Sequence, residues 1–359
     1  MHIVHFSDTH LGHQQYPKLH ASGLNQRELD HYEAFHAVID AAIAARPDVV
    51  IHAGDLFDGV RPSNRALREA MNGFLKLSAA GIETILIAGN HEHPKLRSTG
   101  SSFGLFEHLP HVHPVFKGKA ESFPIAGGLV HAIPQCNTPE ELQAQVESLE
   151  PSPSDVLVLH GAVHDLEAFH HAEFNEQSLN PSWFNGFGYV ALGHYHGVQQ
   201  VADNAWYCGA PDRVSMRESG EEKGYLEIKN GAVTFHALPG RPYQDLPVLH
   251  AEGLDAAGLD AAVQDALATI QPGAVARLRI EGISPSLRGT LDQKSWRAPH
   301  ALYLDLKLEW EDQERAVRGA VEFGGLADEF EAFAAQHVVD DLQRDRLLSM
   351  ARTLLQEAS

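Results

Sequence analysis

Five short segments of the chain combine aspartate, asparagine and histidine in a way that suits divalent metal ions. Neutral imidazole and carboxylate oxygens bind manganese, iron and zinc, and two cysteines are too few for a cage of thiolates. Each segment directly follows an apolar run of residues. The segments are Asp8-Thr-His10, Gly54-Asp55-Leu-Phe-Asp58, Gly89-Asn90-His91-Glu92, Leu159-His160-Gly161 and Gly193-His194-Tyr-His196.

The apolar runs predict strands that end at these residues. We expect strands over 2–7, 48–53, 82–88, 156–160 and 189–193, with helices over 24–45 and 63–80 between the first three. Alternating strands and helices are typical of a layered α/β fold, in which side chains just past the carboxyl ends of neighbouring strands converge on one crevice. Segments far apart in the sequence can therefore build one site.

The residue types in these segments suit a pair of ions. Asp8 and His10 can both turn into the site, while Asp55 can offer one oxygen to each ion. Two ions about 3.5–4 Å apart lower the pKa of a shared water and neutralise the oxygens of a phosphate under attack. The sequence therefore predicts phosphoester hydrolysis. The remaining candidate ligands are Asn90, His160, His194 and His196.

Taken in this order, the motifs resemble those of the calcineurin-like metallophosphoesterase superfamily, whose series runs D-x-H, G-D, G-N-H-[D/E], H and G-H-x-H. The stretches Ser7-Asp-Thr-His-Leu-Gly12, Ala53-Gly-Asp-Leu-Phe-Asp58 and Ala191-Leu-Gly-His-Tyr-His196 look like the branch of double-strand-break repair nucleases, represented in bacteria by the SbcD subunit of the SbcCD exonuclease. The resemblance covers most of residues 1–238. It implies an α/β fold: a layered β-sandwich core flanked by helices, with a small α+β cap domain and C-terminal helices.

The resemblance also implies roles for individual residues. One metal would be held by Asp8, His10, Asp55 and His196, and the other, also usually manganese, by Asp55, Asn90, His160 and His194. His91 matches the family's catalytic histidine, and an imidazole that titrates near neutrality suits protonation of a departing alkoxide. The expected reaction is attack of a metal-bridging hydroxide on phosphorus, with His91 assisting the leaving group.

Residues near the motifs could position the substrate. Archaeal and eukaryotic relatives carry a second histidine three residues after the bridging aspartate, whereas this chain has Asp58, which either hydrogen-bonds a ligand histidine or caps its loop. Arg61, Lys95 and Arg97 could contact backbone phosphates, or they could be ordinary solvated side chains. His13, beside the first motif, could touch the substrate.

Composition limits how the chain could hold DNA. The 27 Lys and Arg against 48 Asp and Glu give a net charge of −21, which argues against binding of nucleic acid by bulk charge. Firm DNA binding is therefore expected partly from a partner, which by resemblance would be an SbcC-like ATPase subunit. No apolar stretch reaches 18 residues and the two cysteines fit a reducing compartment, so we expect a cytoplasmic protein outside the membrane.

The length of 359 residues allows a large catalytic domain and a smaller one. We expect a metallophosphoesterase domain over 1–240, a linker over 238–247, an α+β cap domain over 247–320 and a C-terminal helical pair over 325–357. That pair packs on the chain's own core or docks a partner. By resemblance, relatives dimerise through helices beside the active domain, so a homodimer is expected, with 63–80 and 103–106 as candidate contacts, although packing in the chain's own core explains both segments at least as well.

Other functions compete with this interpretation. A nucleotide or small-molecule phosphodiesterase of the same superfamily would use the same ligands. A protein phosphatase normally has arginine directly after the second aspartate of the motif, where this chain has Gly59, and a non-catalytic scaffold should lack ligands that are all present here. The appended domain favours a two-metal-dependent DNA phosphodiesterase, an exonuclease or endonuclease that acts in DNA repair or DNA end processing.

Overall fold

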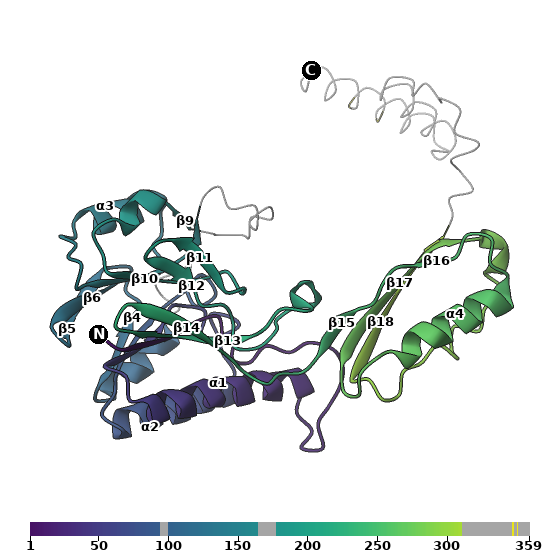
Figure 1. Ribbon diagram of the computed structural model, residues 1–359, viewed down its shortest axis with the longest axis horizontal. Helices are drawn as coiled ribbons and strands as arrows, with labels where there is room; N and C mark the ends of the chain where they lie inside the picture. The colour runs from purple at the N-terminus through teal and green to yellow at the C-terminus, as the bar shows by residue number, and fades with distance from the viewer. Residues whose placement is uncertain (94–99, 164–176, 311–346, 348–349, 351–359) are drawn as a thin grey trace.

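A computed structural model describes residues 1–93, 100–163, 177–310, 347 and 350. Figure 1 shows a larger body that contains the N-terminus and a smaller body to its right that contains α4 (Ala256–Ala268). Most of the expected C-terminal helical pair lies outside the described residues. Within the described residues, no helix combines the length and apolar character needed to cross a membrane.

Two six-stranded sheets form the larger body. The first has the order β14-β13-β1-β2-β3-β4, in which β1 to β4 run parallel. Its strands are β1 (Ile3–Phe6), β2 (Val49–His52), β3 (Glu83–Ile87), β4 (Val112–Val115), β13 (Gly224–Lys229) and β14 (Ala232–Ala237). The second has the order β11-β12-β10-β7-β6-β5. Its strands are β5 (Glu121–Ile125), β6 (Gly128–Ala132), β7 (Val156–His160), β10 (Tyr189–Gly193), β11 (Gln199–Ala202) and β12 (Ala205–Tyr207).

Side chains of the two sheets share one core, and helices cover the outer faces. In β2, Val49 and Ile51 lie in the core between the sheets, whereas Val50 packs in a second core with the helices of the first sheet. Helices α1 (Gln26–Ala45) and α2 (Asn64–Ala79) and the 3-10 helix η2 (Ser102–His108) supply that second core. Helix α3 (Pro139–Glu147) and the 3-10 helix η4 (Pro181–Phe184) pack on the second sheet. The layered β-sandwich flanked by helices is thus confirmed.

Local capping explains where the two long helices begin and end. The side chain of Asn25 accepts hydrogen bonds from the N–H groups of Arg27 and Glu28, and that of Ser63 accepts one from Ala66, so both helix starts have a capped backbone. Helix α1 ends at Ala45, and its C-cap residue Arg46 has a left-handed conformation with φ 50°, from which its N–H donates to the Ala42 carbonyl. The expected helices thus begin one or two residues later than the sequence indicated.

The smaller body is a parallel sheet with one helix on it. Its strands are β15 (Tyr243–Asp245), β16 (Leu249–His250), β17 (Val275–Ile283) and β18 (Tyr303–Trp310), with the 3-10 helix η6 (Pro285–Leu287) after β17. Leu259, Val263 and Leu267 of α4 pack against the sheet. The stretch expected as a linker supplies β15, because its backbone pairs with β17 from Tyr243 to Asp245.

Side-chain contacts join the two bodies beyond the connecting chain. The rings of Tyr16 and Tyr303 stack with centroids 4.4 Å apart. Arg241 bonds to Asp30 of α1 at 2.6 Å and to the Gly273 carbonyl at 2.8 Å. The smaller body is therefore held against the start of α1. The short elements β8 (Ala162–Val163), β9 (Ser178–Leu179) and the 3-10 helix η5 (Met216–Glu218) complete the fold.

Candidate metal centre

The strand ends that carry the motifs meet at one edge of the sandwich. β1, β2 and β3 run parallel in the first sheet, and β7 and β10 run parallel in the second, so each set of carboxyl ends lies together. Ligand atoms from both sheets approach within 4.8 Å of one another in mixed clusters. The expected ligands brought to this edge are Asp8, His10, Asp55, Asn90, His160, His194 and His196.

Several of these residues have a left-handed backbone. The φ angles are 53° at Asp8, 43° at His10, 54° at Asp55 and 103° at His194. Such angles cost about 1–3 kcal/mol each in a residue with a side chain and persist only where the surroundings impose them. Here the N–H of Asp8 donates to the Gly54 carbonyl at 3.0 Å, and that of His10 donates to the Asp55 carbonyl at 3.1 Å. The two loops thus hold each other in the strained form.

Two glycines of the motifs allow the loops to approach closely. A Cβ on Gly89 would lie 2.2 Å from Oδ1 of Asp55, and a Cβ on Gly54 would lie 2.3 Å from Nδ1 of His160. No real Cβ occupies such positions, because both distances are far inside van der Waals contact. Glycine is therefore required at both positions beside Asp55 for a steric reason.

The ligand atoms fall into two neighbouring sets with Asp55 between them. Asp8, His10 and His196 form one cluster, and Nε2 of His10 lies 3.2 Å from Nε2 of His196. Asp55, His160 and His194 form the other. Asn90 belongs beside this second cluster, because its Oδ1 lies 2.9 Å from Nε2 of His160, which is itself 3.3 Å from Oδ2 of Asp55.

Three histidines have a fixed tautomer. Nδ1 of His160 lies 2.8 Å from the Ala53 carbonyl, Nδ1 of His91 lies 3.1 Å from the Asp58 carbonyl, and Nδ1 of His196 lies 3.1 Å from the Glu218 carboxylate. These oxygens can only accept, so each Nδ1 carries the hydrogen and, in a neutral ring, Nε2 keeps its lone pair. An imidazole held in this way presents Nε2 to a metal ion or a substrate.

The electrostatics of the centre favour a cation. Burial opposes ionisation of Asp55, but the imidazoles of His160 and His10 outweigh burial and hold the pKa of this carboxyl well below its usual value. Burial likewise lowers the pKa of His160, but the charge of Asp55 reverses this and raises that pKa to about 10. A buried carboxylate that attracts a proton onto its histidine neighbour also attracts a divalent ion, so the donor set fits two such ions.

His91 lies at the open rim of the centre. Its backbone N–H donates to Oδ1 of Asp55 at 3.1 Å, its ring lies 4.8 Å from that of His10, and its side chain is 31% exposed. Nε2 of His91 lies 4.0 Å from Oδ2 of Asp55. The structure therefore places His91 beside both ligand sets, with its free nitrogen open to an incoming group.

Glu92 has a structural role that the sequence analysis did not assign. Its buried carboxylate accepts the N–H of Phe57 at 2.5 Å and the N–H of Gly89 at 2.9 Å, which joins the loops after β2 and β3. Burial raises the pKa of Glu92 to about 8, and the nearby charge of Asp55 adds to the shift. The signal was in the sequence, because an acidic residue follows His91 directly in the third motif.

Asp58 does not hydrogen-bond His10, the nearest of the expected ligand histidines. Its Oδ1 lies 2.9 Å from Nδ1 of His13 and 3.7 Å from Nδ1 of His10, and the second distance is too long for a hydrogen bond. Asp58 thus orients His13, beside the centre. Arg61 is exposed on the following loop, whereas Lys95 and Arg97 lie outside the described residues.

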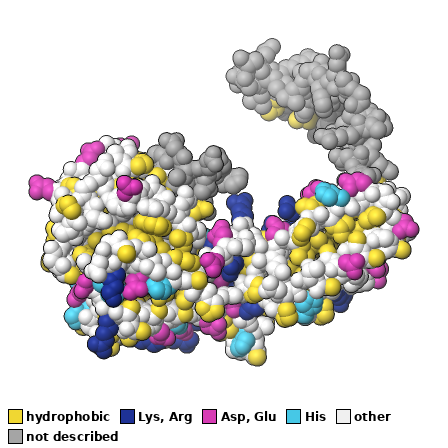
Figure 2. All heavy atoms as spheres, in the orientation of Figure 1, with side chains coloured by type: hydrophobic (Ala, Val, Ile, Leu, Met, Phe, Trp, Pro, Cys, Tyr) yellow, Lys and Arg dark blue, Asp and Glu magenta, His cyan; other side chains and the backbone are white. Residues whose placement is uncertain are grey.

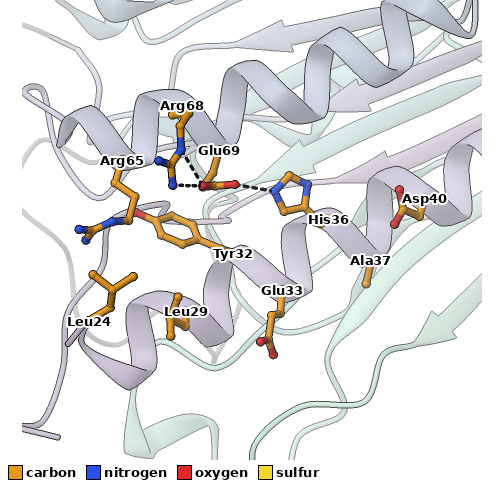
Figure 3. A pocket seen from close by; sticks show the side chains of 10 residues that line it. All are labelled: Leu24, Leu29, Tyr32, Glu33, His36, Ala37, Asp40, Arg65, Arg68 and Glu69. Atoms are coloured by element: carbon orange, nitrogen blue, oxygen red, sulfur yellow. Dashed lines mark hydrogen bonds and ion pairs between the residues drawn. The ribbon is translucent and has the colours of Figure 1, made fainter. Parts of the chain in front are cut away.

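A groove of about 440 Å³ lies elsewhere, between α1 and α2 (Figure 3). Tyr32 and His36 of α1 face Arg65, Arg68 and Glu69, near the start of α2. Glu69 bonds to both Arg68 and His36, so its charge is already balanced within the groove. None of the residues that line this groove is an expected metal ligand.

Comparison with known proteins relates this chain to a family and to several named relatives. Residues 1–198 match the family of calcineurin-like phosphoesterases. The protein named DNA double-strand break repair protein Mre11 from Methanococcus maripaludis is 33% identical over 243 residues, which are 64% of this chain and 61% of that protein. The protein of the same name from Saccharolobus solfataricus is 32% identical over 69% of this chain and 62% of its own length. The one from Haloferax volcanii is 29% identical over 99% of this chain and 82% of its own length.

The aligned regions thus span a little over three fifths of the first two relatives. Among solved structures, that of the phosphoesterase Yfce from E. coli superposes on 66% of this chain, and the superposed part is 93% of the Yfce chain. The TM-score is 0.32 and the sequence identity is 14%.

Proposed function

Because the chain belongs to the calcineurin-like phosphoesterase family, we propose that it is a two-metal-dependent DNA phosphodiesterase, a nuclease that acts in DNA repair or DNA end processing. The observation that carries the proposal is the position of Asp55. Its carboxylate lies between a ligand set from the ends of β1 and β10 and a second set that also draws on β7. A carboxylate shared by two sets is the arrangement that two-metal hydrolysis requires.

The chemistry divides between the bound ions and the chain. When bound, the ions would lower the pKa of a water between them and offset charge on the phosphate oxygens. The protein's part is to hold the ligands in place and to supply a proton. His91 suits the second task, because the Asp58 carbonyl orders its Nδ1–H and leaves Nε2 facing the centre. A protonated His91 would give its Nε2 proton to the departing oxygen.

DNA as the substrate is supported by the relatives and by the shape of the molecule. The relatives are named as DNA double-strand break repair proteins. Figure 2 shows a hollow between the larger and the smaller body, with basic and acidic side chains on its walls. Three cations of the sheet in the smaller body are each paired with a nearby aspartate, namely Arg277, Arg279 and Lys307. Much of the positive charge that meets a phosphate would therefore come from the bound ions.

Manganese is the proposed ion. The donor set is made of imidazoles, carboxylates and one amide oxygen, which is the mixture of nitrogen and oxygen ligands that manganese accepts. Both cysteines are buried free thiols and lie outside the ligand sets, so no soft ligand biases the centre toward copper or zinc. The unpaired thiols also support the proposed cytoplasmic location.

Two kinds of protein partner belong to the proposal. A net charge of −21 leaves bulk DNA binding to another subunit, for which an SbcC-like ATPase is the proposed candidate. Leu347 and Met350, which lie near the C-terminus, expose 42% and 58% of their surface and could contact it. A homodimer is proposed through α2 and η2, where Leu75 and Leu105 are 46% and 49% exposed.

The test is cleavage of end-labelled linear duplex and single-stranded DNA by the purified chain with Mn²⁺, beside His91→Asn with its metal content checked. We expect Mn²⁺-dependent degradation by the wild type and a loss of about 10²–10⁴-fold in the metal-loaded variant, as for removal of a general acid. Cleavage of a small chromogenic phosphodiester without cleavage of either DNA would instead favour a nucleotide or small-molecule phosphodiesterase. Equal rates for the two proteins would remove His91 from the mechanism.

A further inference from the structure

Glu218 lies directly behind the metal-ligand face of His196. It is the last residue of η5 and lies 22 positions after His196 in the sequence, and its carboxylate reaches Nδ1 of His196 at 3.1 Å. Glu218 is 7% exposed, so water does not compete for this bond. The opposite nitrogen of the same ring, Nε2, faces His10 at 3.2 Å. The carboxylate and the ligand cluster therefore lie on opposite sides of one imidazole.

Other donors fix the Glu218 carboxylate itself. Oε1 also accepts the N–H of Ser215 at 3.1 Å, and Oε2 accepts the N–H of Val214 at 3.2 Å. Nζ of Lys223 lies 2.7 Å from Oε2 and donates to the His196 carbonyl at 2.8 Å. Lys223 is 2% exposed, so its ammonium depends on these partners. Side chain and backbone of His196 are thus held by two charged residues that contact each other.

The segment that carries Glu218 is also hydrogen-bonded to the smaller body. The hydroxyl of Ser219 donates to the Tyr243 carbonyl at 2.8 Å and accepts the N–H of Asp245 at 3.0 Å. Tyr243 and Asp245 belong to β15, the first strand of the smaller body. The segment that supports His196 is therefore hydrogen-bonded to the first strand of the smaller body.

We propose that Glu218, supported by Lys223, is a positioning residue that holds His196 in the orientation its metal ion requires. A carboxylate that accepts the second N–H of a ligand imidazole fixes the tautomer and the ring angle, and it makes Nε2 a better donor. The effect falls on one ligand set, because Glu218 contacts His196 and none of Asp55, Asn90 and His160. This inference rests on the two-metal function proposed above.

The experiment measures metal binding, which does not depend on any activity. Metal-free wild type, Glu218→Ala and Glu218→Gln are titrated with Mn²⁺ by calorimetry, and electron paramagnetic resonance reports whether bound ions are magnetically coupled or isolated. We expect two coupled ions in the wild type. In Glu218→Ala the affinity of one site should fall about 10–100-fold and an isolated ion should appear, with the second affinity unchanged. Glu218→Gln, which keeps an acceptor oxygen, should lose less.

Two matched controls separate positioning from simple support of the loop. Glu221→Ala removes a carboxylate that also contacts Lys223 but does not reach His196. Glu222→Ala removes an exposed carboxylate of the same segment. Both variants should bind Mn²⁺ like the wild type. Two results for Glu218→Ala would overturn the proposal. One is a loss of affinity by the same factor at both sites, together with a lower melting temperature of the metal-free protein. The other is an unchanged affinity at both sites.

Activity separates this inference from the proposed function. A wild type that binds two coupled ions yet cleaves no DNA would contradict the nuclease proposal, and the binding data on Glu218→Ala would still decide the positioning role. Restored single-site affinity in Glu218→Gln relative to Glu218→Ala is the sign that a hydrogen-bond acceptor, and not the volume of the side chain, supports His196.

Discussion

Two buried histidines under the metal centre should make the fold sensitive to mild acid. His5 of β1 and His52 of β2 are both fully buried, and they bond to the Tyr189 hydroxyl and the Thr9 hydroxyl. Burial lowers the pKa of each from 6.5 to about 3, and repulsion from His52 adds to the shift at His5. Both are therefore neutral in the folded chain at pH 5, while the unfolded chain protonates them.

The sign and size of the effect follow from these values. Above pH 6.5 both states are neutral at these positions and the histidines contribute no pH dependence. Below pH 6.5 the unfolded state binds more protons, so the free energy of unfolding falls by about 1.36 kcal/mol per pH unit and histidine until the pH reaches the folded pKa. At pH 5 the loss is roughly 2 kcal/mol for each residue and about 4 kcal/mol for the pair.

The assay is urea unfolding of the metal-free protein at pH 7.5 and pH 5, followed by circular dichroism. The perturbation is the double variant His5→Asn and His52→Gln, in which each amide replaces the ring nitrogen that makes the hydrogen bond. The variant should lose about 4 kcal/mol less than the wild type between the two pH values, whatever its stability at pH 7.5.

The control for this experiment changes two exposed histidines in the same way, as His108→Asn and His250→Gln. Other groups titrate in wild type and variants alike, so the difference between them isolates the buried pair. An equal acid loss in the double variant and the wild type would refute the assignment of the acid sensitivity to His5 and His52.

Three further changes test the packing around the centre. Gly89→Ala should abolish metal binding while circular dichroism stays native, because the new Cβ would lie 2.2 Å from Oδ1 of Asp55; retained metal would contradict this. Glu92→Gln should lower the free energy of unfolding by about 1–3 kcal/mol at pH 9, since its NH₂ group faces a backbone N–H of Phe57 or Gly89, and an unchanged urea midpoint would exclude that clash. Arg27→Met should cost about 3–5 kcal/mol in the same assay, because Asp212, 3% exposed, loses its cation at 2.7 Å; a smaller loss than for Arg68→Met would be inconsistent with a buried pair.

Much of the fold could be predicted because apolar runs end at chemical motifs. Strands over 156–160 and 189–193 have the expected bounds, since both are buried along their whole length. β4 and β5 were not predicted, because Pro114 and Pro124 interrupt their patterns and proline usually argues against a strand. Helix α3 was also not predicted, although Thr138 and Pro139 are a cap and a first-turn proline.

The sequence predicts only those site residues that lie in a motif directly after a strand. Each motif follows a strand within a few residues, so topology alone brings the ligands together. Glu218 and Lys223 carry no such signal, because they lie 22 and 27 positions after His196 in the sequence, with no periodicity to link them to it. The linker interpretation of 238–247 was incomplete, because a three-residue strand such as β15 is set by its pairing with β17 and not by its own sequence.

The central claim is that Asp55 joins two metal ions, and counting bound ions tests it most directly. Metal-free wild type and Asp55→Ala are loaded with Mn²⁺, freed of excess ion and analysed for manganese per chain. Two ions per chain in the wild type and almost none in a folded Asp55→Ala would agree with a shared carboxylate between the two clusters. Two ions retained by Asp55→Ala would contradict it.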